Sequence, residues 1–206
     1  MFENYQEMMH FVKQLNNKPT LLLHSCCAPC STHVLFLLKD YFDITVFYSN
    51  DNIYPLEEFK KRVDEEKRFC KQLQIPVIED DYDSLAFDTA IKGFEYDKER
   101  SERCYKCYQL RLTKTAQKAA SLKFDYFTTT LSISPYKISR WINEIGLQLE
   151  KEFNVSFLYS DFKKENGYQK SILYSKQYNL YRQDYCGCKY SKEERAEYVS
   201  EQNKEN

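Results

Sequence analysis

The sequence predicts an α/β protein in which a parallel sheet is flanked by helices, a Rossmann-like architecture. Two observations support this fold class. Short apolar runs of strand length alternate along the chain with longer amphipathic stretches of helical period. From the first apolar run onward, the order is strand, helix, strand, helix, strand, which is typical of right-handed βαβ crossovers and of a sheet covered on both faces.

Each element predicted in the first part of the chain has its own sequence signal. The run TLLLHSC is apolar and too short for a helix, and the helix after it takes Ser31 or Thr32 as its N-cap. Pro55 stands at a favoured first position of the second, charged helix. In chain order we predict a strand at 20–26, a helix from Ser31 onward, a strand at 43–50, a helix at 55–74 and a strand at 75–80.

The same alternation continues downstream without an internal repeat. We predict a helix at 103–123, a strand at 125–132, a helix at 134–153, a strand at 155–162 and a helix at 172–181. These elements make a single catalytic domain over residues 1–206. It carries an N-terminal extension at 1–19, an insertion at 81–103 that leads to a pair of cysteines, and a charged C-terminal tail at 190–206 whose end frays.

Charge and composition exclude several classes of protein. Lys and Arg number 30 against 31 Asp and Glu, so the chain has no overall cationic field for nucleic acid, and any such contact must come from a local patch. The start, MFENYQEMMHFVKQLNN, lacks a basic segment followed by an apolar run, so we expect neither a signal peptide nor a membrane anchor. These features predict a cytoplasmic protein that does not bind a membrane.

The eight cysteines are unevenly distributed. Seven of them form three close groups, which are Cys26, Cys27 and Cys30 in HSCCAPCS, Cys104 and Cys107 in a CxxC, and Cys186 and Cys188 in a CxC. Cys70 stands alone in an amphipathic helix and is predicted to be a small core residue. In a reducing cytosol, such groups indicate metal ligation or thiol chemistry rather than a disulfide framework.

Three kinds of chemistry fit these thiols. Structural zinc would take four ligands from two CxxC motifs but would leave Cys26 and the CxC unused. A thioredoxin-like dithiol would use one CxxC and leave the other cysteines without a role. An iron–sulfur cluster takes four thiolates, tolerates adjacent cysteines and leaves further thiols for redox work or for a second metal, so it accounts for the most residues.

Other polar residues lie near the cysteines in the predicted fold. His24 precedes them by two positions and is a candidate either for orienting a thiolate and donating a proton or for a core histidine. Asp81 and Asp83 follow the third strand at the same edge of the sheet, where they could act as metal ligands, as an acid or as turn residues. Arg103 and Arg182 could neutralise an anionic cluster or bind phosphate, or they could be ordinary solvated surface residues.

Two further segments are candidates for substrate contacts. A helix that begins at Ser134 would present free amides and the positive end of its dipole to a phosphate or carboxylate, although Ser-Pro is also an ordinary way to begin a helix. A basic patch near the CxC could hold RNA, although a mixture of Lys and Tyr is also ordinary surface. The patch consists of Lys163, Lys164, Lys170, Lys176, Arg182 and Lys189, with Tyr168, Tyr181 and Tyr185 interspersed for stacking on bases.

Six segments occur in a defined order between about residue 20 and residue 192, namely LLHSCCAPCS, FYSNDNIYP, RCYKCYQLRL, YFTTTLSISPYK, GYQKS and YRQDYCGCKYS. Together they resemble the epoxyqueuosine reductases of the QueH family. The resemblance implies a fold of the adenine nucleotide alpha hydrolase-like group. It also implies the last step of tRNA queuosine biosynthesis, in which the epoxide of epoxyqueuosine at the anticodon wobble position accepts two electrons and loses its oxygen as water.

The resemblance also implies roles for individual cysteines. It assigns Cys26, Cys27, Cys104 and Cys107 to a [4Fe-4S] cluster. The partners that it implies are a tRNA carrying epoxyqueuosine and an electron donor that the sequence does not identify.

A redox-active disulfide between Cys186 and Cys188 and a second, mononuclear metal ion, iron or zinc, are implied in the same way. The candidate ligands of that ion are Cys30, Asp81, Asp83 and the CxC thiols.

A competing hypothesis is a zinc-stabilised module that binds tRNA or is structural and has no redox activity. A nucleotide hydrolase of the same fold would need a Gly-rich phosphate loop after the first strand, where this chain has cysteines.

Overall fold

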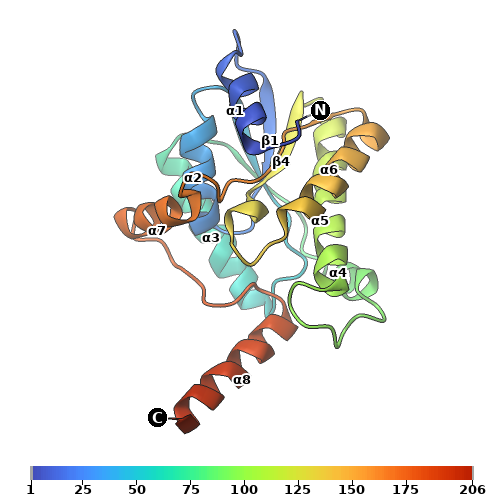
Figure 1. The fold of residues 1–206 in the computed structure, drawn as a ribbon, viewed down its shortest axis with the longest axis vertical. Helices are drawn as coiled ribbons and strands as arrows, with labels where there is room; N and C mark the ends of the chain where they lie inside the picture. The colour runs from blue at the N-terminus through green and yellow to red at the C-terminus, as the bar shows by residue number, and fades with distance from the viewer. Residues whose placement is uncertain (1, 206) are drawn as a thin grey trace.

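The computed structural model describes residues 2–205 and confirms the α/β fold class (Figure 1). A five-stranded sheet has the strand order β3-β2-β1-β4-β5, and every neighbouring pair is parallel. The strands are β1 (Thr20–His24), β2 (Asp43–Tyr48), β3 (Val77–Glu79), β4 (Tyr126–Thr129) and β5 (Ser156–Phe157).

Helices cover both faces of the sheet because successive side chains of a strand point to opposite faces. Leu21 and Leu23 pack into a core shared with α1 and α2, whereas Leu22 packs into a second core shared with α5 and α6. The helices are α1 (Tyr5–Lys13), α2 (Ala28–Leu38), α3 (Leu56–Gln72), α4 (Ser84–Ala90), α5 (Glu102–Ser121), the 3₁₀ helix η1 (Thr130–Ile133), α6 (Ser139–Phe153), α7 (Gly167–Gln177) and α8 (Lys189–Glu205).

The strand order changes direction at β1, in the middle of the sheet. His24, the last residue of β1, lies opposite Phe47 of β2 and Thr129 of β4. In an open parallel sheet, such a switch point forms a crevice at the carboxyl ends of the strands. The loops that follow β1, β2 and β4 therefore meet at this point, and the loop after β1 carries the first cysteine group.

Three predicted helix starts are wrong, and one of them is that of α7, which begins at Gly167 rather than at residue 172. The helix after the first strand, α2, begins at Ala28 with Cys27 as its N-cap, and not at Ser31 or Thr32. Pro29 is accommodated in its first turn, where the missing amide hydrogen of proline is not needed. Cys30 is therefore helical.

The helix predicted to begin at Ser134 begins at Ser139 instead. The chain after β4 first forms η1 and then a turn in which the Lys137 amide donates to the Ser134 carbonyl at 3.2 Å and the Tyr136 amide donates to the Ser134 hydroxyl at 3.2 Å. The free amides of α6 are therefore not at Ser134, and the predicted anion site at a helix end there is not formed.

Three segments outside the βαβ units have defined structure. In the N-terminal segment, α1 buries Tyr5, Met8 and Val12 against the core, so it contributes to the main body of the protein. The insertion contains α4, whose first amides donate to the Asp83 side chain. The C-terminal segment forms α8, which projects from the body of the molecule (Figure 1).

No helix within residues 2–205 combines the length and the apolar character that a membrane crossing requires.

The burial of α1 leads to a prediction about stability. Met8 is 0% exposed, so Met8→Ala should lower the free energy of unfolding by about 2–5 kcal/mol, through lost apolar contact and the cavity left behind. The measurement is urea unfolding of purified protein. Gln6→Ala, at an exposed position of the same helix, is the control and should change stability by less than about 0.5 kcal/mol. Equal stability of the two variants would contradict the placement of α1 in the core.

Candidate active site

A cavity of about 630 Å³ opens at the carboxyl edge of the sheet. It collects several residues that the sequence analysis singled out, namely Cys26, Cys30, Ser134, Tyr168, Arg182 and Cys186. Leu131 and Ile133 of η1 add apolar surface, and Arg111 and Lys137 add buried cations. The cavity thus combines thiols, apolar walls and positive charge, which suits an enclosed site for an anionic or redox-active group.

Cys26, Cys27 and Cys30 form a compact thiol trio. Their sulfur atoms all lie within 4.8 Å of one another, with 2.8 Å between the Sγ atoms of Cys27 and Cys30. All three residues are free cysteines. Hydrogen bonds with Cys27 and Cys30 outweigh burial and hold the pKa of Cys26 well below its usual value. Three converging soft donors fit a thiophilic metal or an iron–sulfur cluster.

A buried carboxyl group binds the residues on either side of the thiol trio. Glu66 of α3 accepts hydrogen bonds from the Ser25 hydroxyl at 2.8 Å and the Ser31 hydroxyl at 2.7 Å. Burial raises the pKa of Glu66 to about 7. Glu66 was not among the site residues predicted from the sequence. Its signal was present, because Glu66 lies three residues from both Val63 and Phe69 on the apolar face of the helix.

Arg111 is a second buried group that the sequence analysis missed. Its Nε donates to His24 Nε2 at 3.3 Å, and its Nη2 donates to the Asn50 side-chain oxygen. Arg111 is only 2% exposed, and it interacts electrostatically with Cys107 and Cys26. The available signal was its position four residues after Cys107, on the same helical face.

His24 acts within this arrangement as a neutral, fully buried side chain. Burial, followed by the charge of Arg111, lowers the pKa of His24 to about 3. Its Nδ1 lies 2.8 Å from the Thr129 hydroxyl, and its Nε2 lies 3.1 Å from the Ser49 carbonyl. These contacts favour a positioning role over proton donation from a charged imidazole.

Of the remaining cysteines in residues 2–205, only Cys186 lines the cavity, and no group of three potential ligand atoms within 4.8 Å of one another includes Cys104 or Cys107. Cys107 of α5 packs with Cys188 and Phe87, and burial raises the pKa of Cys107 to about 12. The CxC turn is anchored, since Arg62 Nη1 donates to the Cys186 carbonyl at 3.1 Å and the Tyr54 amide donates to the Gly187 carbonyl at 2.8 Å. Gly187 has φ of +136°, a backbone conformation that favours glycine.

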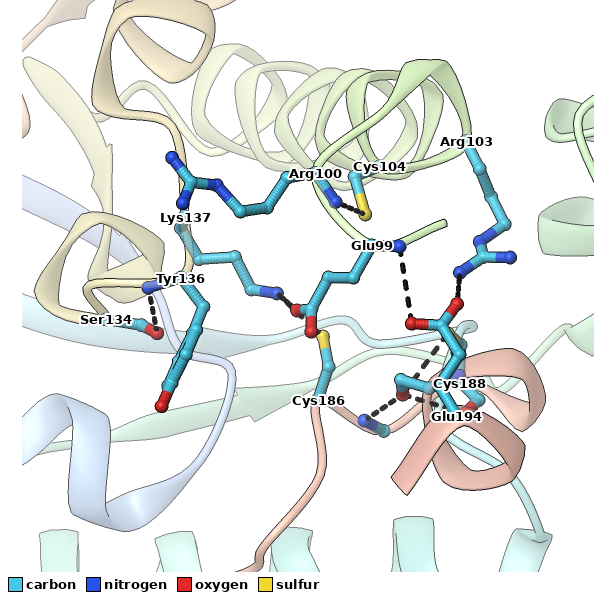
Figure 2. Close-up of polar contacts among 12 residues, drawn as sticks. Glu99, Arg100, Arg103, Cys104, Ser134, Tyr136, Lys137, Cys186, Cys188 and Glu194 are labelled. Atoms are coloured by element: carbon cyan, nitrogen blue, oxygen red, sulfur yellow. Dashed lines mark hydrogen bonds and ion pairs between the residues drawn. The ribbon is translucent and has the colours of Figure 1, made fainter. Parts of the chain in front are cut away.

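Figure 2 shows two ion pairs that join the insertion and α8 to this side of the cavity. Lys137 Nζ lies 2.7 Å from Glu99 Oε1 and 3.0 Å from Cys186 Sγ. Arg103 Nη2 donates to Glu194 at 2.7 Å. Arg103, predicted to neutralise an anionic cluster or bind phosphate, anchors the first turns of α8 and also interacts electrostatically with Cys188 and Cys104. Lys137 was not among the residues predicted from the sequence.

Several predicted site residues lie away from the cavity wall. Asp81 is exposed, and Asp83 caps α4, so neither carboxylate faces the thiol trio. Lys163 donates to the Lys137 carbonyl at 2.9 Å, and Lys164 is 56% exposed. Cys70 is buried in the core, as predicted.

The fold and this site define a class of protein, an α/β protein with a parallel five-stranded sheet and, after its first strand, a cluster of three cysteines that could hold a metal ion. Two solved structures are similar in fold. The U34-tRNA thiolase NcsA from Methanococcus maripaludis with its [4Fe-4S] cluster has a TM-score of 0.58 at 15% identity, covering 90% of this chain and 67% of that one. A predicted subunit of tRNA methyltransferase from Methanocaldococcus jannaschii has a TM-score of 0.52 at 12% identity, covering 74% of each chain.

The family is shown by sequence. The model of the family described as epoxyqueuosine reductase QueH matches residues 21–194, and the chain belongs to this family. It is 40% identical over 192 residues to the epoxyqueuosine reductase QueH of Streptococcus pyogenes, covering 90% of this chain and 75% of the relative. It is 35% identical over 181 residues to that of Thermotoga maritima, covering 86% of this chain and 93% of the relative.

The chain is therefore an oxidoreductase that converts epoxyqueuosine to queuosine in tRNA. The family membership confirms the reductase hypothesis and does not support a zinc module without redox activity.

The buried carboxyl of Glu66 leads to a prediction about pH. Because its pKa is raised to about 7 from 4.5, the folded protein keeps a proton that the unfolded chain releases, so stability falls as pH rises from about 4.5 to 7. Glu66→Gln removes this loss. Between pH 5 and pH 8, wild-type protein should lose about 2–4 kcal/mol of unfolding free energy relative to the variant.

The measurement is chemical unfolding of anaerobically purified protein at both pH values. Glu57→Gln, at an exposed position of the same helix, is the control and should follow wild-type protein at both. Parallel pH dependence of Glu66→Gln and wild-type protein would show that Glu66 does not titrate in this window.

Proposed function

We propose that the thiol-lined cavity is the place where epoxyqueuosine is reduced and that Cys26, Cys27, Cys104 and Cys107 hold a [4Fe-4S] cluster beside it. The observation that carries this proposal is the thiol trio in the wall of the cavity. Cys104 supports it, because it packs against the same apolar cluster as Cys26. The cation of Arg111 lies near both cysteine groups, where it would offset the negative charge of bound thiolates.

The trio also contains a thiol beyond the four proposed cluster ligands. Cys30 is in contact with Cys27 and lines the cavity, so it is the first candidate ligand for a second, mononuclear iron or zinc ion. Asp81 and Asp83 are less favoured, since one is exposed and the other caps a helix. When bound, a cluster supplies electrons singly and a mononuclear ion supplies Lewis acidity.

The CxC pair can provide the redox equivalents that this reaction consumes. Conversion of an epoxide to an alkene and water takes up two electrons and two protons, breaks two C–O bonds and forms one C=C bond. Oxidation of two thiols to a disulfide releases the same two electrons and two protons. Cys186 lines the cavity and Cys188 is buried behind it, so we assign them this role, with a one-electron carrier outside the chain restoring the thiols.

The mouth of the cavity offers contacts for the anticodon of tRNA. Arg182 lies 5.5 Å from the centre of the Tyr168 ring, and its Nη2 is 3.3 Å from the Tyr168 hydroxyl. Ser134 lines the same wall, and Tyr136 beside it is 61% exposed. Planar side chains at the entrance suit unstacked bases of a single-stranded loop, whose wobble nucleotide would then enter the cavity.

The first prediction from this proposal concerns metal content. Anaerobically purified protein should contain about four iron and four acid-labile sulfide per chain, with visible absorbance that bleaches on reduction by dithionite. Replacement of Cys26, Cys27, Cys104 or Cys107 by Ala should remove the iron and the absorbance. Cys70→Ala is the matched control and should retain both, because Cys70 is buried in the core.

Cys188→Ser separates a redox role from a ligand role in the same measurement. If the CxC is a redox pair, turnover should be lost while iron content and absorbance remain. Loss of all three would instead make Cys188 a metal ligand. A colourless wild-type protein with stoichiometric zinc would refute the cluster.

The second prediction concerns tRNA. The double variant Lys164→Gln/Lys170→Gln, at two exposed lysines of the basic patch, should raise KM for tRNA and lower the slope of log affinity against log salt by about 1.4, since each phosphate contact contributes about 0.7. kcat should stay close to that of wild-type protein. The control is Lys67→Gln/Lys71→Gln on α3, which should leave both the slope and KM unchanged. An unchanged slope in the first variant would remove these two lysines from the RNA-binding surface.

A further inference from the structure

Lys137 is a buried cation in the cavity wall to which the reduction proposed above gives no role. It is 7% exposed and follows η1 in the turn that closes on Ser134. The backbone is fixed on both sides, because the Lys137 amide donates to the Ser134 carbonyl at 3.2 Å and the Lys137 carbonyl accepts from Lys163 Nζ at 2.9 Å. Its ammonium group is therefore held at a defined place.

The ammonium group has one donor to spare. Glu99 Oε1 at 2.7 Å and Cys186 Sγ at 3.0 Å take two of its three N–H groups. Within residues 2–205, no third acceptor for Lys137 Nζ is in contact, and the side chain lines the cavity. Figure 2 shows Lys137 and Glu99 directed toward one another beside Cys186, with Ser134 and Tyr136 on the neighbouring turn.

The other charged groups around the cavity are engaged elsewhere. The guanidinium of Arg111 donates to His24 and Asn50. Arg182 lies on Tyr168, and Arg195 pairs with Asp184 at 3.5 Å. Glu99 and Glu194 are anionic and would repel a developing negative charge. Lys137 is thus the buried cation best placed to receive an oxygen anion.

Opening of an epoxide by electrons places negative charge on its oxygen as the first C–O bond breaks. A charged donor fixed in a water-poor site stabilises such a charge more strongly than a mobile one. We infer that Lys137 donates a hydrogen bond to the epoxide oxygen of the substrate and stabilises the alkoxide formed from it.

This inference rests on the proposal that reduction takes place in this cavity. Lys137 keeps all its protons in the step, and the two protons that leave with the oxygen as water come with the two electrons of the overall reaction. Glu99 and Cys186 orient the ammonium group and leave its third N–H for the substrate.

The test is Lys137→Met, assayed anaerobically with tRNA carrying epoxyqueuosine and with dithionite as reductant. We expect kcat to fall by about 10²- to 10³-fold, as for loss of one oxyanion donor, with KM for tRNA within about threefold of wild-type protein. Addition of methylammonium should restore part of kcat in proportion to its concentration, because the small cation can enter the space that the ammonium group leaves. Lys67→Met, an exposed lysine on α3, is the control and should keep wild-type kinetics.

A binding measurement without reductant separates this role from a structural one. Wild-type protein should bind epoxyqueuosine tRNA about two- to tenfold more tightly than the same tRNA carrying queuosine, and Lys137→Met should lose that preference. Iron content and melting temperature of the variant should match wild-type protein.

A kcat within about threefold of wild-type protein would overturn the inference. A loss of kcat together with iron, without rescue by methylammonium and with the binding preference intact, would also overturn it and make Lys137 structural. In either case, turnover by wild-type protein would leave the proposed function standing. Failure of wild-type protein to turn over would overturn both.

Discussion

The buried guanidinium of Arg111 is the interaction on which the arrangement of the site depends. It donates to His24 at the end of β1 and to Asn50 after β2, so one side chain of α5 joins the helix of the CxxC to both strands at the switch point. A hydrogen bond to a charged group contributes about 1.5–3 kcal/mol, so these two bonds help to hold the helix and the strands in place. The same cation lies near Cys26 and Cys107, where it would offset the charge of thiolates bound in the cluster proposed above.

The thiol trio stands on a rigid polar support. Glu66 accepts from Ser25 and Ser31, which flank the trio in sequence, and Asn50 donates from its side-chain amide to the Ser25 carbonyl at 2.9 Å. The hydroxyl and carboxyl groups satisfy one another in the interior, so their burial is not penalised by unpaired atoms. These hydrogen bonds hold the start of α2, where Cys27 is the N-cap. A side chain at the start of a helix is positioned more precisely than one on a loop.

The outer wall of the cavity comes from segments outside the βαβ units. Arg62 anchors the CxC turn to α3, the ion pair of Arg103 with Glu194 fixes the first turns of α8, and Glu99 of the insertion reaches Lys137. The parallel sheet therefore supplies the floor of the cavity, whereas the insertion and the C-terminal segment complete its wall.

The sequence by itself determined the parallel sheet, the three cysteine groups and the family, because hydrophobic period and close spacing are properties of neighbouring residues. It misplaced the starts of α2 and α6, where Pro29 fits inside a first turn and Ser134 closes a turn instead of a helix. Only the tertiary structure decided that Glu66, Arg111 and Lys137 face the thiols. Arg111 and His24 lie 87 residues apart and Lys137 and Cys186 lie 49 apart, and contacts at such separations follow from how the strands are ordered rather than from any local pattern.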